Sequence, residues 1–283
     1  MTTHFRRIIQ LLALIAACSA QLPAQAPSLD QRAVARVVAL NGLIGGVTSA
    51  MRAGISGKDV RKPFLLGVLG GAGYGVGKIV GSRGHVATAI VGNLTSGIGS
   101  SVVANAGRGA GWADELMVPV GPLRARFFRS ERDRFALSVN ATEAVVAIST
   151  FAHRDLRIDW KRSAAAGAFV FVTDERQIRL RGRMVGGVAN TSVIVIGEFF
   201  PDAQAVLRHE IAHVHQHWFM QENWGRPMED AVRRVDFIGR WIPSWIELGI
   251  TVPVLYAAEV NAFGYPGPLR RAQENEAETL ARR

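Results

Sequence analysis

Weakly polar segments with regularly placed glycines fill the first half of the chain. Apolar residues recur at helical spacing over residues 31–53, and residues 63–80 and 86–106 combine aliphatic side chains with glycines three or four positions apart. Small residues at this spacing let helices pack closely. We therefore expect a Gly-rich helical region over residues 31–115, either inserted in a membrane or packed as a soluble subdomain. Polar residues within the third segment, such as Asn93 and Ser100, favour the soluble or membrane-adjacent alternative.

The pattern changes at residue 119 to short β-branched or alternating stretches separated by turn residues. They predict an antiparallel meander whose strands cover residues 123–128, 134–139, 144–151, 156–160, 168–172, 178–183 and 192–197. Arginines alternate with apolar residues in two of these strands, as Arg124 and Arg126 and as Arg179, Arg181 and Arg183. We interpret these arginines as the solvated faces of the strands.

Residues 1–17 have the pattern of a secretory signal. Two arginines precede an apolar run over residues 8–17, which is too short to span a bilayer as a mature helix. The run ends at Cys18 in a sequence like the lipobox of bacterial lipoproteins, which predicts lipidation of Cys18; cleavage after Ala20 or Ala26 is the alternative. Residues 18–30 are rich in Pro, Ala and Gln and predict a tether. We thus expect a bacterial cell envelope protein, lipid-anchored or periplasmic or secreted, whose membrane contacts are the lipid anchor and possibly the Gly-rich helices.

Composition narrows the class of protein further. With 48% hydrophobic and 20% charged residues, the 283-residue chain is not intrinsically disordered. A single cysteine excludes an intramolecular disulfide, a Cys-rich zinc finger and an iron–sulfur cluster. The formal charge of +10 comes almost entirely from arginine, and no aromatic residues are interleaved with the strand arginines as single-strand binding requires. We therefore expect no nucleic-acid partner.

The motif His209-Glu210-x-x-His213 contains residues suited to metal binding and catalysis. It lies in a stretch that predicts a helix over residues 203–220. His209 and His213 are four residues apart, so both imidazoles lie on one helix face and can bind one metal ion. Glu210 lies on the neighbouring stripe, placed to act as general base on a metal-bound water. A catalytic zinc ion needs a third protein ligand and one open position.

The third ligand has to come from outside this motif. His217 lies about 12 Å along the helix from His209, too far for the same ion, and Gln216 and Phe219 stand where a metzincin needs Gly and His. The remaining candidates are downstream carboxylates: Glu222, Glu229, Asp230, Asp236, Glu247, Glu259, Glu274, Glu276 and Glu278. Residues 268–282 contain no helix breaker, and a carboxylate followed by another four residues later suits a ligand with a supporting partner.

His209-Glu210-x-x-His213 followed by Glu274-x-x-Ala277-Glu278 resembles the gluzincin metallopeptidases. The resemblance covers roughly residues 190–283 and implies an α+β, zincin-like domain, with an antiparallel sheet and an HExxH active-site helix, after the Gly-rich helices. It implies Zn²⁺ as cofactor, a peptide or protein as substrate, Glu274 as third ligand and Glu278 as the residue that orients a histidine. Glu278 replaces the Asp of the family pattern, and Glu259-x-x-Ala262 competes weakly for the same role.

We therefore expect a β-meander plus metallopeptidase domain over residues 116–283, with residues 192–197 as the strand beside an extended substrate. Tyr256 and Tyr265 are candidate oxyanion donors. Six aromatic residues are expected to pack beneath the metal helix: Trp218, Phe219, Trp224, Phe237, Trp241 and Trp245. The alternatives are a non-catalytic envelope lipoprotein with a structural or degenerate metal site, and a membrane-interacting helical module.

Overall fold

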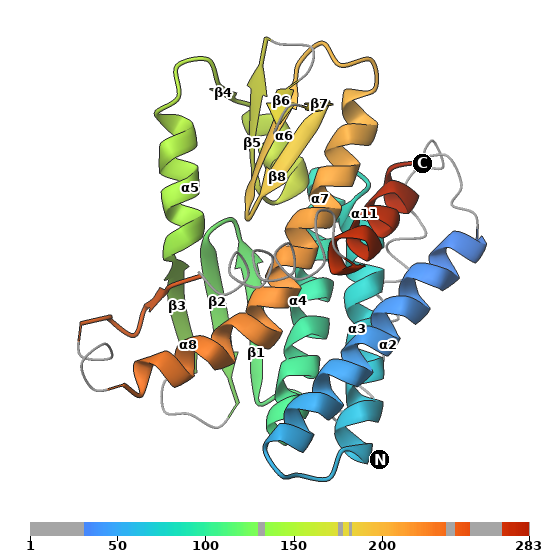
Figure 1. The fold of residues 1–283 in the computed structure, drawn as a ribbon, viewed down its shortest axis with the longest axis vertical. Coiled ribbons are helices and arrows are strands. Elements are labelled where there is room, and N and C mark those ends of the chain that lie inside the picture. Colours follow the sequence, from blue (N-terminus) through green and yellow to red (C-terminus); the bar gives the residue numbers. More distant parts are fainter. Residues whose placement is uncertain are drawn as a thin grey trace.

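The computed structural model of the protein describes residues 31–282 apart from 130–133, 175–177, 181–182, 236–240 and 250–267. In this part of the chain the protein is α+β, with mixed rather than purely antiparallel sheets. Helices α2, α3 and α4 form a bundle on one side, two sheets lie on the other, and helix α7 runs between them (Figure 1). The predicted residues Cys18, Tyr256, Tyr265, Glu259, Asp236 and Phe237 lie outside the described residues.

The Gly-rich helices form as predicted, as α2 (Gln31–Ile55), α3 (Arg61–Gly81) and α4 (Val86–Arg108). Their backbones are in direct contact at the glycines. A Cβ atom on Gly45 would lie 2.4 Å from the carbonyl oxygen of Gly67, and one on Gly77 would lie 2.3 Å from the backbone nitrogen of Ser96. Glycine is therefore required at these crossings because no side chain fits between the helices.

The strands form two four-stranded sheets and a hairpin. The first sheet has the order β1 (Glu115–Val120), β2 (Leu123–Phe128), β3 (Phe135–Asn140) and β10 (Ile246–Glu247). The second has the order β4 (Arg157–Ile158), β5 (Phe169–Thr173), β9 (Val193–Gly197) and β8 (Gly187–Asn190). The hairpin pairs β6 (Ile178–Leu180) with β7 (Arg183–Val185).

The predicted antiparallel meander is wrong in two respects. The pairs β3–β10 and β5–β9 are parallel, because other elements intervene between their strands and return the chain in the same direction. The predicted strand at residues 144–151 is instead part of helix α5 (Ala141–Phe151). Asn140 caps this helix by accepting a hydrogen bond from the backbone N–H of Glu143 at 3.0 Å, and this local signal outweighs the β-branched composition.

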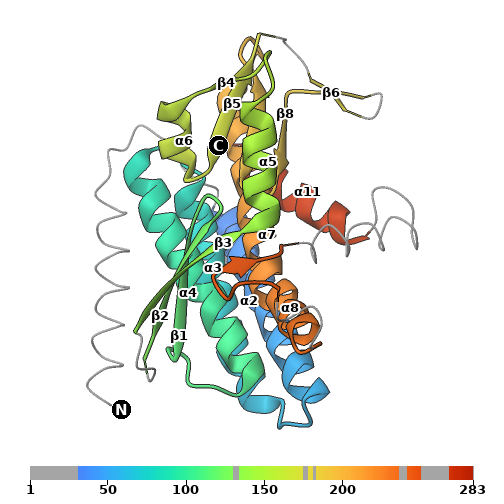
Figure 2. The ribbon, with the colours of Figure 1, turned by 90° about the vertical axis from the view of Figure 1, so that its left-hand side faces the viewer.

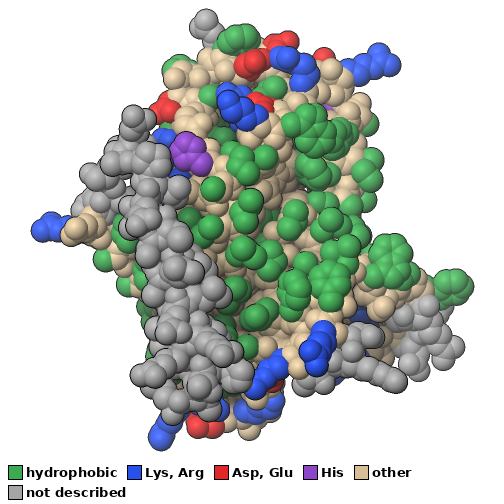
Figure 3. Space-filling view, turned by 180° about the vertical axis from the view of Figure 1, so that it is seen from behind, with side chains coloured by type: hydrophobic (Ala, Val, Ile, Leu, Met, Phe, Trp, Pro, Cys, Tyr) green, Lys and Arg blue, Asp and Glu red, His purple; other side chains and the backbone are tan. Residues whose placement is uncertain are grey.

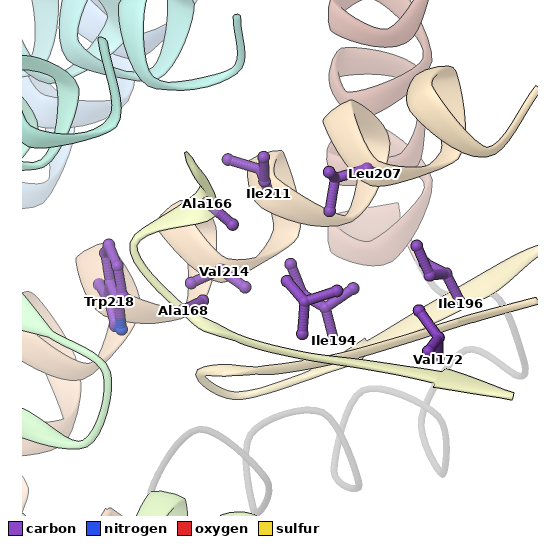
Figure 4. Packing of buried hydrophobic residues seen from close by; sticks show 10 residues of the cluster. Ala166, Ala168, Val172, Ile194, Ile196, Leu207, Ile211, Val214 and Trp218 are labelled. Carbon is purple, nitrogen blue, oxygen red and sulfur yellow. The ribbon is translucent and has the colours of Figure 1, made fainter. Parts of the chain in front are cut away.

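Helix α7 (Ala203–Met220) packs on the second sheet and forms the main core. Its apolar face, from Leu207 to Trp218, meets strands β5 and β9 (Figure 4). The helix begins at the capping residue Asp202, which accepts from the backbone N–H of Ala205. It continues into a π-helical turn, η1 (Gln221–Gly225), and into α8 (Arg226–Arg233). Two further helices are α6 (Trp160–Ala166) and α11 (Pro268–Ala281), and α11 packs against α7.

The interpretation of Arg124 and Arg126 as solvated is wrong, since both are buried. Arg124 is paired with Glu143. The guanidinium of Arg126 contacts Glu222 and Glu247 at 2.9 and 2.8 Å, and Glu115 also contacts it at 2.8 Å. The alternation of charged and apolar residues shows which residues share a face of the strand, but not which face is buried. Here the arginine face is buried, because carboxylates from distant segments neutralise its charge. The side chains of Arg179, Arg181 and Arg183 lie outside the described part.

The predicted aromatic cluster forms only in part. Trp218 and Phe219 are buried, and Phe219 packs on Tyr74 of α3. Trp241 and Trp245 are 79% and 55% exposed, so they do not pack beneath the metal helix. Both residues lie in the segment just before β10, which pairs with β3 of the first sheet.

Candidate metal centre

Helices α7 and α11 bring three potential metal ligands together. The Nε2 atoms of His209 and His213 lie 3.1 Å apart. The Oε2 atom of Glu274, from α11, lies 3.2 Å from the first and 3.3 Å from the second. Two atoms bound tetrahedrally to zinc at 2.0–2.1 Å lie about 3.3 Å apart. The three atoms therefore have the spacing of three corners of a zinc coordination tetrahedron.

The surroundings of His209 favour a cation. Burial lowers the pKa of this imidazole, but a hydrogen bond to Glu274 and the charges of Glu210, Glu274 and Glu278 outweigh burial and raise it. Carboxylates thus make the potential at His209 negative. A divalent cation between the three ligands would neutralise this excess.

Glu210 is buried beside the ligands. Burial raises the pKa of its carboxyl group, against the lowering effect of the two histidines and of a hydrogen bond from the backbone N–H of Ala189. A carboxylate with a raised pKa is a better proton acceptor near neutral pH than a solvated one. Ala189 lies on strand β8, so Glu210 is held between the helix and the edge of the second sheet.

A cleft of about 410 Å³ opens over these residues. Strand β8 and the segment before it form one wall, α7 forms the floor and α11 forms the other wall. Its apolar lining consists mainly of small aliphatic residues: Val185, Val188, Ala189, Ala205, Val206 and Ala281.

The strand beside the cleft is not the predicted one. Residues 193–197 form β9, which is enclosed between β5 and β8, so the free edge that borders the cleft belongs to β8. The carbonyl of Gly186 accepts a hydrogen bond from the N–H of Gly197, so the backbone groups of Gly186 point towards β9. In an antiparallel pair every second residue points the same way, so the backbone groups of Val188 and Asn190 also face β9. The backbone groups of Gly187 and Ala189 therefore point away from β9, towards the free edge.

His213 is oriented by Gln216, a residue that the sequence pattern did not indicate. The Nδ1 atom of His213 lies 2.8 Å from the Oε1 atom of Gln216. An amide oxygen only accepts, so Nδ1 carries the proton, and the lone pair of Nε2 is available to bind a metal ion. Gln216 in turn donates to the Glu276 carboxylate at 2.8 Å and to the carbonyl of Gln273 at 3.1 Å. Its amide group is thereby fixed with the oxygen towards His213.

Glu276 connects this arrangement to the helical bundle. Its carboxylate is buried, contacts the Nζ atom of Lys78 at 2.5 Å and accepts from the amide of Asn41 at 2.5 Å. Burial would raise the pKa of Glu276, but Lys78 and the hydrogen bonds from Asn41 and Gln216 lower it. Residues of α2 and α3 therefore hold in place the side chain that positions a candidate ligand.

The other predicted carboxylates have different partners. Glu222 and Glu247 pair with Arg126, and Glu229 accepts from Gln221 and from two backbone N–H groups. Glu278 lies in the wall of the cleft and pairs with Arg282 at 3.1 Å; its role in orienting a histidine stays a prediction. His217 lies 3.7 Å from Glu143.

Among the described residues, His209, His213 and Glu274 are the one group of three or more His, Cys, Asp or Glu side chains spaced to hold a metal ion. Comparison of the chain with known proteins identifies no relative. No protein-family model, no curated protein and no solved structure matches the chain.

Proposed function

We propose that the protein is a zinc-dependent metallopeptidase of the zincin type that hydrolyses peptide bonds in the bacterial cell envelope. The observation that carries the proposal is the triangle of His209, His213 and Glu274 ligand atoms, with sides of 3.1–3.3 Å, in a cleft beside buried Glu210. The envelope location rests on the signal pattern of residues 1–17 and on Cys18, which lie outside the described residues.

The three ligands fit zinc by their chemistry as well as by their spacing. Two imidazoles and one carboxylate form a donor set used by catalytic zinc sites, which keep a fourth position for water. Glu274 is partly exposed towards the cleft, so that position is accessible from solvent. When bound, zinc would lower the pKa of its water ligand towards about 7 and polarise the substrate carbonyl.

Glu210 would act as the general base. Its carboxylate would accept a proton from the attacking water and pass this proton to the nitrogen of the leaving amine. Burial and the N–H of Ala189 hold the carboxylate beside the ligands. His213 needs its Nε2 lone pair for the ligand role, and Gln216 ensures this by accepting from Nδ1.

Strand β8 would bind the substrate. The free N–H and C=O groups of Gly187 and the C=O of Ala189 can pair with a peptide in the extended conformation. The small aliphatic lining of the cleft suits apolar side chains next to the scissile bond.

Two variants test the proposal. Glu210→Gln is expected to retain zinc in metal analysis of the purified protein and to lose cleavage of a mixed-sequence fluorogenic peptide library. Glu274→Ala is expected to lose both zinc and cleavage. Wild-type turnover by Glu210→Gln would refute the role of the base, and equal zinc content in wild type and Glu274→Ala would refute the third ligand. Zinc-loaded wild type that cleaves no peptide would instead indicate a structural metal site.

A further inference from the structure

The helical bundle has its polar and apolar residues in reversed positions relative to a water-soluble protein. From residue 40 to the end of α2, the exposed large side chains are all aliphatic or Met: Leu40, Leu43, Ile44, Val47, Met51 and Ile55. The buried residues over the same stretch are small or polar: Asn41, Gly42, Gly45, Gly46, Thr48, Ser49 and Ala53. Burying glycine and serine while exposing leucine and isoleucine is unfavourable in water.

The other two helices repeat the reversal. On α3, Leu65 and Leu69 are about two-thirds exposed while the neighbouring Gly67, Gly70 and Gly71 are buried. On α4, Val86, Ile90 and Leu94 face outwards, and the buried positions include Asn93, Thr95, Ser96, Ser100, Ser101 and Asn105. Small and hydroxyl residues between helices, with large aliphatic residues outside, are typical of helix packing in membranes.

Charged residues are confined to the ends of the three helices. The sequence has none between Arg36 and Arg52, none between His85 and Arg108, and between Lys62 and Arg83 only Lys78, which is buried against Glu276. These intervals are about 24, 34 and 31 Å long at 1.5 Å per residue. The hydrocarbon core of a bilayer is about 30 Å thick. Each helix contains an 18-residue window with a mean hydropathy of 1.4, and by length and composition all three could cross it.

The first sheet also buries charged residues and exposes apolar ones. Glu115, Arg124 and Arg126 point inwards, whereas Phe127, Phe135 and Leu137, on the opposite face, are about half exposed. An open sheet edge is not tolerated in lipid unless its backbone groups are satisfied.

The edge of this sheet at β1 is covered by polar side chains of α4. The N–H of Met117 donates to Ser101 at 2.8 Å, and the carbonyl of Glu115 accepts from Asn105 at 2.7 Å. Strand β1 packs alongside α4 (Figure 2). The buried polar residues of α4 therefore satisfy backbone groups that water would otherwise bind.

We propose that the outer faces of α2, α3, α4 and the first sheet contact the acyl chains of a lipid bilayer, so that the protein is embedded in the membrane. Seen from behind, the middle of the molecule shows mainly hydrophobic side chains, and the charged ones gather towards its upper and lower ends (Figure 3). The exposed apolar positions lie on both sides of α4, since α2 and the first sheet flank it (Figure 1). A second copy of the chain would cover the exposed apolar residues on only one of these sides, whereas lipid would contact them on both sides. The proposal does not depend on peptidase activity.

The test uses spin labels attached to single cysteines in a variant that has no native cysteine. Cys18 is the sole cysteine, so Cys18→Ala removes both the native thiol and the predicted lipid anchor. Single cysteines replace Leu43 or Leu69, and Asp174→Cys, at an exposed position directly after strand β5, is the control. Each nitroxide-labelled protein is reconstituted in phosphatidylethanolamine–phosphatidylglycerol vesicles, and collisions of the label with oxygen and with a water-soluble nickel chelate are compared.

Because oxygen concentrates in lipid, we expect labels at positions 43 and 69 to collide more often with oxygen than with the nickel chelate. The label at position 174 should collide more often with the nickel chelate. Membranes from cells producing Cys18→Ala should retain the protein through an alkaline carbonate wash and release it only with detergent. Dominance of the nickel chelate at positions 43 and 69 would overturn the proposal, as would labels shielded from both reagents, which indicate a protein cover. Release of Cys18→Ala by carbonate would overturn it as well.

Discussion

Replacing Gln216 tests whether the hydrogen bond to His213 prepares the metal centre. In Gln216→Leu, the Nδ1–H of His213 loses the acceptor that lies 2.8 Å away. The imidazole is then free to adopt the other tautomer, in which Nε2 carries the proton and cannot bind metal. Loss of such a partner lowers metal affinity by about 10–100-fold, which corresponds to ~1.4–2.8 kcal/mol.

The same change has a structural cost that can be measured separately. Glu276 loses one of its hydrogen bonds but keeps Lys78 and Asn41, so the metal-free protein should lose about 1–3 kcal/mol of unfolding free energy. Gln216→Glu separates the two effects. Its carboxylate still accepts from Nδ1, which preserves zinc affinity, but it faces the Glu276 carboxylate and lowers stability.

Zinc dissociation constants from competition with a fluorescent chelator, and urea unfolding of the metal-free proteins, provide the two measurements. Gln204→Leu is the control, because Gln204 is an exposed glutamine on the same helix. It should bind zinc like the wild type. If folded Gln216→Leu also binds zinc with wild-type affinity, the backbone alone orients His213 and the reasoning is wrong.

The close contacts in the bundle and the buried ion pairs can be tested by urea unfolding. Gly71→Ala should destabilise the protein by about 1–3 kcal/mol, because its Cβ would lie 2.1 Å from the carbonyl oxygen of Asn41. Gly73→Ala, whose Cβ has its nearest atom at 3.8 Å, should be neutral or stabilising by up to ~1 kcal/mol; equal effects would contradict the packing. Burial would raise the pKa of Glu222, but Arg126 and Arg226 lower it from 4.5 to about 2. This depressed pKa stabilises the fold above pH 4.5 by ~3 kcal/mol, at ~1.4 kcal/mol per pKa unit. The contribution is lost as the pH falls from 4.5 towards 2, so Glu222→Gln should flatten the stability curve there, and an unchanged curve would refute the ion-pair account.

Periodicity predicted the helices well and the strands less well. The helices over residues 31–53, 63–80 and 86–106 were found within a few residues, because their spacing of small and apolar residues fits one secondary structure. The prediction of a strand over residues 144–151 rested on their β-branched composition and did not take into account the cap at Asn140 that starts helix α5.

The inward direction of Arg124 and Arg126 could not be read from the sequence. Their alternation with apolar residues fits either orientation, and the carboxylates that neutralise them come from segments up to 121 residues away. The usual assumption that charged residues face water led to the opposite interpretation. The preference for a soluble or membrane-adjacent bundle rested instead on uncharged polar residues such as Asn93 and Ser100, which are buried between the helices.

The candidate metal centre was predictable where its residues share a local pattern. His209 and His213 follow from their spacing on one helix, whereas Glu274 was indicated among the downstream carboxylates by the resemblance to the gluzincin pattern. Gln216 is three residues from His213 and could have been found as a same-face neighbour. Lys78 stood out as a lone charge in an apolar segment, but its partner Glu276 is 198 residues away, a distance over which spacing carries no information.

The contacts of Glu276 have a consequence for how the chain can be divided. A fragment that begins at residue 116 would contain every candidate ligand and Gln216, yet it would lack Asn41 and Lys78. Glu276 would lose two of its partners, and the apolar residues Ala212, Ala277 and Leu280, which pack against Val37 and Ile79, would be exposed to water. We therefore expect residues 116–283 to need the preceding helices in order to hold α7 and α11, and with them the candidate metal ligands, in place.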